Sequence, residues 1–187
     1  MSIKGKKVTL RAIERTDLAT LQVWANDDSI NQMIGGWHFP TNMRDTETWF
    51  EALNLRSLNQ RYIIETPGEG TIGSANLVAI NWKDRNAEHG LLIGNKDAQG
   101  KGYAVDTIMA IMKYAFEELG LNRLDTTIIE YNEPSINLYS NKCGWKKEGE
   151  QRNWYFRKNK YWSRLFYGIT KDDYAELIEK TNYWNEG

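Results

Sequence analysis

The pattern of hydrophobic and polar residues predicts a protein of mixed α and β structure. Lys7 to Ile13 is a predicted strand, because Val8 and Leu10 fall on one face of an extended segment. Thr16 is a suitable N-cap for a helix over residues 17–26. The next predicted elements are an irregular segment over 27–40, a helix over 44–55, and strands over 61–66, 71–80 and 87–93.

The second half of the chain contains the longest predicted helix, Tyr103 to Leu119. Its apolar positions step by four, three and four residues and therefore share one buried face; they are Ala104, Ile108, Ile111 and Ala115. Gly120 follows as a helix C-cap. The remaining predicted elements are a strand over 123–130, a short helix from Glu133, a hairpin with its turn at 157–160, and a final helix capped by Thr170. This order predicts a mixed sheet covered by helices.

Composition restricts the classes of function. The chain has 187 residues with 41% hydrophobic residues, which is typical of one globular domain. A formal net charge of −1 argues against a nucleic-acid-binding protein that depends on positive charge. We also expect no membrane segment and a cytoplasmic location, because no apolar run approaches the ~20 residues that span a bilayer and the N-terminus does not resemble a signal peptide.

The metal-binding and nucleophilic residue types are scarce. Cys143 is the one cysteine, so an intramolecular disulfide and a thiolate metal cluster are excluded, and we expect this residue to be a small buried hydrophobe. His38 and His89 are the two histidines, which argues against a histidine metal site; we predict no metal.

The segment "DAQGKGYAVD", residues 97–106 and here named the glycine loop, has the composition of a phosphate-binding turn. A Walker A loop is rejected, because five residues separate Gly94 from Gly100-Lys101 and Gly102 replaces the required Ser or Thr. A dinucleotide-binding turn is disfavoured, since Val105 occupies the third glycine position.

A third interpretation is a loop that binds a pyrophosphate with the pattern Gln/Arg-x-x-Gly-x-Gly/Ala, which Gln99 to Ala104 matches. Free backbone amides at a helix N-terminus and the positive end of the helix dipole would both face the diphosphate. From the loop alone, a tight turn between strand and helix with no ligand is an equally good interpretation.

A downstream segment, "TTIIEYNEPSINLYSNKCGW", places Asn132 just after a predicted strand and Tyr139 one short helix later. Together with "AEHGLLIGNKDAQGKGYA", it resembles the GCN5-related N-acetyltransferase (GNAT) family, in particular its RimJ/RimL-like branch. The resemblance extends from "LRAIERTDL" to about Gly168. It implies one domain over residues 1–187 with a core of about 7–170. The implied fold is α+β: a mostly antiparallel mixed sheet of six to seven strands, helices on both faces, and two splayed strands that form the acetyl-CoA cleft.

The same resemblance implies the roles of individual residues in transfer of an acetyl group from acetyl-CoA to a primary amine. Tyr139 would protonate the departing thiolate. The pantetheine arm would run along Leu92, Ile93 and Gly94. The pyrophosphate would be held by Gln99, Gly100, Lys101, Gly102, Tyr103 and Ala104. Further cofactor contacts would come from Asn132, Ser135 and Asn137.

The amine has a pKa of about 10 and arrives protonated, so the reaction needs a base or a water chain. Glu88 is the first candidate, and a solvated or ion-paired strand residue is the competing interpretation. His89, on the opposite face of the strand, is the second candidate, and Glu130 is the third. Trp37 and His38 lie in a loop that shapes the acceptor pocket in the family, or they serve loop packing.

The acceptor amine stays open among a nucleotide-linked amino sugar, a polyamine and the N-terminus of a ribosomal protein. Ala79 stands where spermidine N-acetyltransferases tend to have an acidic residue, and "TETWFEALN" looks more like amino-sugar N-acetyltransferases. An acyl-CoA-binding sensor without turnover is the non-enzymatic alternative. The aromatic residues of the last hairpin suggest either a homodimer interface or a wall of the acceptor site.

Overall fold

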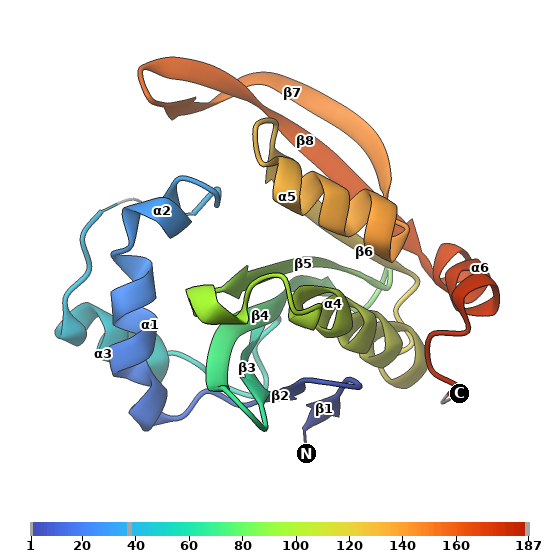
Figure 1. Cartoon of the computed structure of the whole chain (residues 1–187), viewed down its shortest axis with the longest axis horizontal. Coiled ribbons are helices and arrows are strands. Elements are labelled where there is room, and N and C mark those ends of the chain that lie inside the picture. Colours follow the sequence, from blue (N-terminus) through green and yellow to red (C-terminus); the bar gives the residue numbers. More distant parts are fainter. Residues whose placement is uncertain (1, 37–38, 186–187) are drawn as a thin grey trace.

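A computed structural model of the chain describes residues 2–36 and 39–185. Its described part is built on an eight-stranded sheet with the order β1-β2-β3-β4-β5-β6-β8-β7 (Figure 1). The strands are β1 (Ile3–Lys4), β2 (Thr9–Arg11), β3 (Gln60–Thr66), β4 (Gly70–Asn81), β5 (Asn86–Ile93), β6 (Arg123–Ile129), β7 (Lys146–Arg157) and β8 (Lys160–Thr170). The α-helices are α1 (Leu18–Ala25), α2 (Asp28–Asn31), α3 (Met43–Glu51), α4 (Tyr103–Lys113), α5 (Glu133–Ile136) and α6 (Lys171–Thr181).

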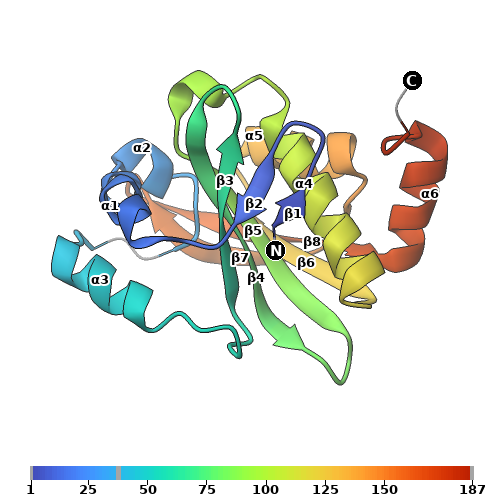
Figure 2. The ribbon, with the colours of Figure 1, turned by 90° about the horizontal axis from the view of Figure 1, so that it is seen from below.

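Helices cover both faces of the sheet, as Figure 2 shows with α1 and α3 on one side and α4 and α6 on the other. The larger core lies under α4 and continues under α6, where Leu10, Ile64 and Tyr174 are buried together. A smaller core on the opposite face joins α1 and α3 to β3 through Leu18 and Ile63. Ile63 and Ile64 are successive residues of one strand, so their side chains point to opposite faces.

One pair of neighbouring strands is parallel, and that pair separates early. β5 and β6 are in register over three residues each, 86–88 with 123–125, whereas every other neighbouring pair is antiparallel. Beyond Glu88, the edge of β5 that faces β6 therefore has no strand partner. The predicted splayed strands are thus present, and the opening between them runs toward α4 and α5 (Figure 1).

The predicted mixed sheet with helices on both faces is confirmed, and its strand count is larger than the six to seven expected. The additional strand is β1, in which Ile3 pairs with Leu10 of β2. A two-residue strand is too short to show a pattern of alternation in the sequence, so tertiary pairing alone reveals it. The hairpin β7–β8 and the final helix follow the sequence prediction, and the Thr170 side chain accepts from the Asp173 amide as the N-cap.

The start of α1 differs from the prediction that Thr16 is the N-cap. A 3₁₀ turn, η1 (Arg15–Asp17), precedes the helix, and Asp17 occupies the N-cap position of α1. The Asp17 carboxylate is buried and pairs with both terminal nitrogens of Arg11, at 2.8 and 2.9 Å. The bidentate ion pair with an adjacent strand outweighs the local capping preference that favours Thr16. The segment 27–40, predicted as irregular, contains α2.

The long predicted helix also changes character. α4 ends at Lys113, and the chain continues as a π-helical segment, η3 (Tyr114–Glu118), before Gly120. Gly120 has φ +66, the left-handed conformation expected of a helix C-cap. No helix in residues 2–36 and 39–185 combines the length and the apolar character needed to cross a membrane.

We expect Asp17→Asn to lower the free energy of unfolding by about 2 kcal/mol at pH 7, because an amide cannot accept the charge-assisted bonds from Arg11. Burial alone would raise the pKa of Asp17, but the hydrogen bonds from Arg11 and from the Glu14 amide outweigh it, and the folded-state pKa lies below the ordinary 3.8. This stabilisation is complete above pH 3.8 and is lost as the pH falls through the lower folded-state pKa. Urea unfolding as a function of pH measures it; a difference between the two proteins that does not shrink as the pH falls below 3.8 contradicts the assignment.

Candidate active site

A cleft of about 660 Å³ lies where β5 and β6 separate. Its walls come from β4, β5, β6 and the segment after β6, and residues 33–36 approach from the N-terminal half. Tyr139 and Glu88, which lie 51 positions apart in the sequence, both line this cleft. The cleft therefore brings together the two residues predicted to be catalytic.

Tyr139 lies in a π-helical segment, η4 (Asn137–Lys142), that continues α5, and its side chain is 4% exposed. Its ring packs edge-on against Trp145 with centroids 5.0 Å apart. Burial raises the pKa of Tyr139 well above its ordinary 10, and a hydrogen bond with Thr126 offsets this only in part. The phenol is thus protonated at neutral pH and can donate to a group in the cleft.

His89 lies on the same side of β5 as Tyr139, with ring centroids 6.0 Å apart. Its Nδ1 is 2.8 Å from the carbonyl oxygen of Asn76, so Nδ1 carries the hydrogen and Nε2 is the bare acceptor. Nε2 is buried without a partner in the described part of the chain. Burial lowers the pKa of His89 to about 4, so the ring is neutral at pH 7 and a weak acceptor for the proton of an ammonium group.

Of the other residues predicted for the acceptor site, one lines the cleft and one lies outside it. Glu88 is exposed and lines the cleft on the face opposite His89, as the alternation of a strand predicts. Glu130 follows β6, where its amide donates to the Ser163 carbonyl oxygen, and it does not line the cleft. Trp37 and His38 lie outside the described residues.

The predicted pantetheine segment begins in the cleft and ends in the sheet. Leu92 lines the cleft, whereas Ile93 pairs with Gly73 of β4. The Gly94 amide donates to the Ile72 carbonyl oxygen at 3.0 Å. A β-carbon at Gly94 would lie 2.2 Å from the Trp24 ring, so glycine is required there for packing of α1 on the sheet.

The glycine loop has the geometry of an anion-binding turn. Gly100 and Gly102 adopt φ values of +76 and +83, and Gly102 is the N-cap of α4. The amides of residues 100–104 have no hydrogen-bond partner in the described part of the chain. Five free N–H groups at the positive end of a helix fit the predicted diphosphate. Gln99, Tyr103 and Ala104 are in place to contribute to the same turn.

Two lysines lie at the glycine loop, one within it and one beside it. Lys101 is held by Glu69, with Nζ to Oε1 at 2.6 Å. Lys7 donates from Nζ to the Lys101 carbonyl oxygen at 3.2 Å, and no acidic partner is paired with it among the described residues. Lys7 was not predicted, because it precedes the loop by more than ninety residues and no sequence pattern connects the two.

The side chains of the second motif have mostly structural contacts. Asn132 caps α5 by accepting from the Ser135 amide at 3.1 Å, and its Nδ2 donates to the Met33 carbonyl oxygen at 2.8 Å. One N–H of the Asn132 amide remains for a ligand. Ser135 lines the cleft, whereas Asn137 is exposed and bonded to Asn141. Asn132 thus attaches the segment after α2 to the wall that carries Tyr139.

A family model described as an acetyltransferase (GNAT) domain matches residues 7–146. The chain belongs to the GNAT acetyltransferase family. This GNAT protein is 28% identical to YokL, an uncharacterized prophage-derived N-acetyltransferase of Bacillus subtilis (strain 168), over 91% of its own length and 93% of the relative. It is also 28% identical to the spermidine N(1)-acetyltransferase of Vibrio cholerae, over 84% of this chain and 89% of that one.

Similarity to solved structures agrees with the family. The crystal structure of spermidine N-acetyltransferase from Vibrio cholerae in complex with CoA and spermine superimposes with a TM-score of 0.83 at 25% identity, covering 90% of this chain and 98% of that one. The GNAT chain is an acetyl-CoA-dependent N-acetyltransferase, as the sequence predicts. No group of three potential ligands close enough to hold a metal ion occurs among residues 2–36 and 39–185.

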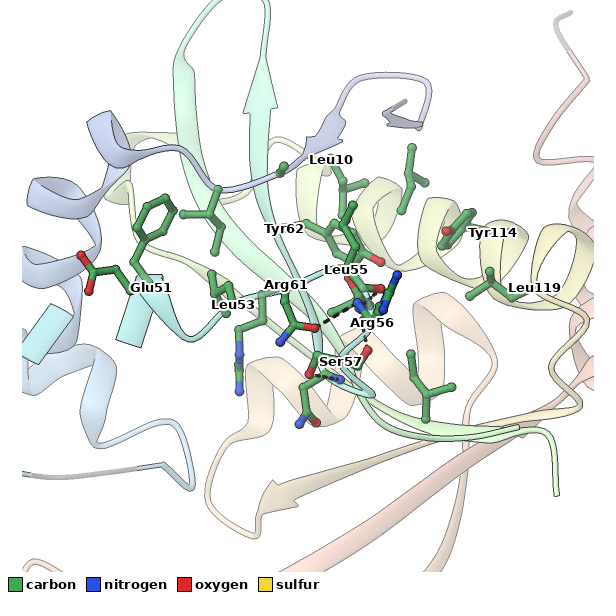
Figure 3. A pocket seen from close by; sticks show the side chains of 18 of the residues that line it. Leu10, Glu51, Leu53, Leu55, Arg56, Ser57, Arg61, Tyr62, Tyr114 and Leu119 are labelled. Atoms are coloured by element: carbon green, nitrogen blue, oxygen red, sulfur yellow. Dashed lines mark hydrogen bonds between the residues drawn. The ribbon is translucent and has the colours of Figure 1, made fainter. Parts of the chain in front are cut away.

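A second cavity, of about 800 Å³, lies at the edge of β3 (Figure 3). β2 ends at Arg11, opposite Ile63, so the segment 60–62 of β3 has no strand partner on that side. Leu10, Tyr62 and Tyr114 are among its lining side chains. Neither Tyr139 nor Glu88 lines this larger cavity. The smaller cleft, which contains both, is therefore the candidate active site of the GNAT protein.

Proposed function

We propose that the cleft transfers the acetyl group directly to the primary amine of a small molecule, with Tyr139 as the acid and Glu88 as the base. The observation that carries the proposal is that the buried Tyr139 lines the cleft where β5 and β6 separate. The glycine loop binds the diphosphate of the donor at one end of this opening. Unpaired β5 amides beyond Glu88 direct its thioester toward Tyr139 and can stabilise the oxyanion.

Tyr139 donates its phenolic proton, or a hydrogen bond, to the sulfur as the carbon–sulfur bond breaks. A thiol in water has a pKa of about 8.5, which would make a tyrosine a poor proton donor to its thiolate. Burial disfavours a bare thiolate, as it does for the Cys143 thiol, whose pKa it raises to about 12. Burial also raises the pKa of Tyr139, so the phenol stabilises the leaving sulfur chiefly through a hydrogen bond.

Glu88 takes up the proton that the ammonium must lose before the amine attacks. Its carboxylate lies on the face of β5 opposite Tyr139, so the acid and the base act on opposite sides of the thioester. Because Glu88 is exposed, water can carry the proton onward to solvent. His89 is too weakly basic for this role and instead packs beside Tyr139.

Glu88→Gln is expected to lower kcat/KM about tenfold to a hundredfold at pH 7, because the protonated amine loses its base. The loss is expected to shrink toward pH 9.5, where a growing share of the amine is already deprotonated. Release of free thiol from acetyl-CoA measures both values, and Glu130→Gln is the matched control outside the cleft. An equal loss at both pH values would show that Glu88 does not act as the base.

The acceptor is proposed from three classes: a nucleotide-linked amino sugar, a polyamine, or the N-terminus of a ribosomal protein. The spermidine N-acetyltransferase of Vibrio cholerae supports the polyamine, whereas Ala79, exposed at an irregularity in β4, brings no acidic charge to bind one. Thiol release over a panel of these amines, with hydrolysis of acetyl-CoA alone subtracted, identifies the class. The RimJ/RimL-like branch and a cytoplasmic location stay predictions.

We also propose that the protein is a homodimer. Trp154, Phe156 and Tyr161 at the tip of the β7–β8 hairpin are each more than half exposed, at 53%, 53% and 58%. Large exposed aromatic side chains are typical of protein interfaces. Light scattering of the purified protein determines its mass in solution, and a Trp154→Ser, Phe156→Ser double variant is expected to shift it toward the monomer.

A further inference from the structure

The charges that line the cleft are not those of a site for a cationic acceptor. Three side chains with a formal charge at neutral pH line its described part: Arg61, Glu88 and Arg164. Two of the three are arginines. Neither arginine has a carboxylate within ion-pair distance in the described part of the chain.

Arg61, on β3, lines both the cleft and the second cavity (Figure 3). It is paired in register with Asn76 of β4, which in turn is paired with Gly90 of β5, so this row of residues shares the face that carries Glu88. The guanidinium carbon lies 6.0 Å from the Trp49 ring centroid. Burial lowers the pKa of Arg61, and no anion nearby compensates. A half-buried guanidinium without an anionic partner is costly unless a ligand supplies one.

Arg164 enters from β8, on the other side of the opening. It is opposite Ile129 of β6, so its strand is the immediate neighbour of the wall of the opening. Its guanidinium carbon lies 5.0 Å from the Trp154 ring centroid and 4.9 Å from that of Phe166. Arg164 Nε is buried and has no hydrogen-bond partner in the described part of the chain.

This environment prepares Arg164 for bidentate binding of an anion. Aromatic rings pack against guanidinium faces and leave the N–H edge available, which matches the two oxygens of a carboxylate or a phosphate. β3 and β8 lie on opposite sides of the β5–β6 opening, so Arg61 adds positive potential from the facing wall. A polycation would meet two uncompensated positive charges and a single carboxylate in this cleft.

We propose that the acceptor is a primary amine that also carries a carboxylate or phosphate, with Arg164 binding this anion, Arg61 supporting it, and Glu88 facing the amine. The proposal rests on the transferase function proposed for the same cleft and selects among its acceptors. It favours an acidic metabolite, such as an amino acid or an amino sugar linked to phosphate, over a polyamine.

The test compares acceptors that differ only in the anion. Glucosamine 6-phosphate is paired with glucosamine, and an α-amino acid with its amide; spermidine is the polycation. We expect kcat/KM to be at least about tenfold higher for the anionic member of one pair, and which pair responds distinguishes phosphate from carboxylate. Preference for spermidine, or equal rates within both pairs, would overturn the inference and leave the transferase function intact.

Substitutions of Arg164 test whether this residue binds the anion of the acceptor. Arg164→Met is expected to lower kcat/KM for the anionic acceptor by about tenfold to a hundredfold, mainly through KM, and to leave the neutral partner unchanged. Arg164→Glu should shift the preference toward spermidine. Arg152→Met, on the exposed side of β7, is the control. Equal losses for both members of a pair would reveal a structural role for Arg164 and overturn the inference.

A second measurement separates this inference from failure of the proposed function. Calorimetric binding of each acceptor to the CoA complex of Tyr139→Phe needs no turnover. Binding of the anionic member that Arg164→Met abolishes supports the anion site even if thiol release is absent from the whole panel, which would instead count against the transferase roles. Absence of any difference in binding between paired amines overturns the anion site.

Discussion

Tyr139→Phe is expected to lower kcat by about 10²- to 10⁴-fold, the range that a positioned proton donor contributes. The substitution removes one oxygen from a ring that is otherwise held by Trp145 and the surrounding core. The departing thiolate then leaves without a donor in an interior where burial strongly disfavours the charged form. Binding of acetyl-CoA, which we propose depends on the glycine loop, is expected to stay within about twofold.

Single-turnover thiol release and calorimetry with CoA measure these two quantities. Tyr167→Phe is the matched control, because Tyr167 is a buried tyrosine of β8 that does not line the cleft. The Thr126 hydroxyl, which bonds to Tyr139, provides a second check: Thr126→Val should give a smaller loss than Tyr139→Phe. A Tyr139→Phe enzyme with unchanged kcat would exclude Tyr139 as the acid.

Asp106→Ala is expected to have the largest effect on stability, lowering the free energy of unfolding by about 3–4 kcal/mol. Asp106 lies in the first turn of α4 and is 1% exposed. Its carboxylate accepts from the amides of Lys6, Lys7 and Val8 at 2.6 to 2.9 Å, and from the Tyr183 hydroxyl at 2.7 Å. Alanine leaves these donors without an acceptor, and the Val8 amide among them is buried.

Loss of the Asp106 carboxylate is also expected to affect the glycine loop. Asp106 holds the turn before β2, and that turn carries Lys7 to its position against Lys101. We therefore expect Asp106→Ala to weaken acetyl-CoA binding in addition to its effect on folding. Urea unfolding and calorimetry measure the two effects.

Asp97, an exposed acid in the same loop, provides the control: Asp97→Ala should change the free energy of unfolding by less than about 0.5 kcal/mol. Equal destabilisation by both variants would contradict the assignment to Asp106.

Local sequence patterns were sufficient for most of the helices and strands and for locating the glycine loop and the segment that carries Tyr139. The glycines at 100 and 102 permit the left-handed backbone that both adopt, and the apolar spacing after them favours a helix, so a turn with free amides is consistent with short-range chemistry. Alternation along 87–93 was enough to place Glu88 and His89 on opposite faces. These features are determined within about ten residues, where propensity and periodicity act directly.

Only the tertiary structure decided the contacts between residues that are far apart in the chain. Arg61 and Arg164 line one cleft because the sheet places β3 and β8 on opposite sides of the β5–β6 opening, and their lack of carboxylate partners is a property of the folded surroundings. Tertiary contacts also decided the position of Lys7 beside the glycine loop, the ion pair of Arg11 with Asp17 at the start of α1, and the pairing of β1 with β2. The sequence by itself thus determined the family and its acetyl-CoA donor, through motifs for which we propose binding of the diphosphate and protonation of the thiolate. The selection of the acceptor depends on charges from distant strands, which have no common local pattern and meet only when the sheet forms.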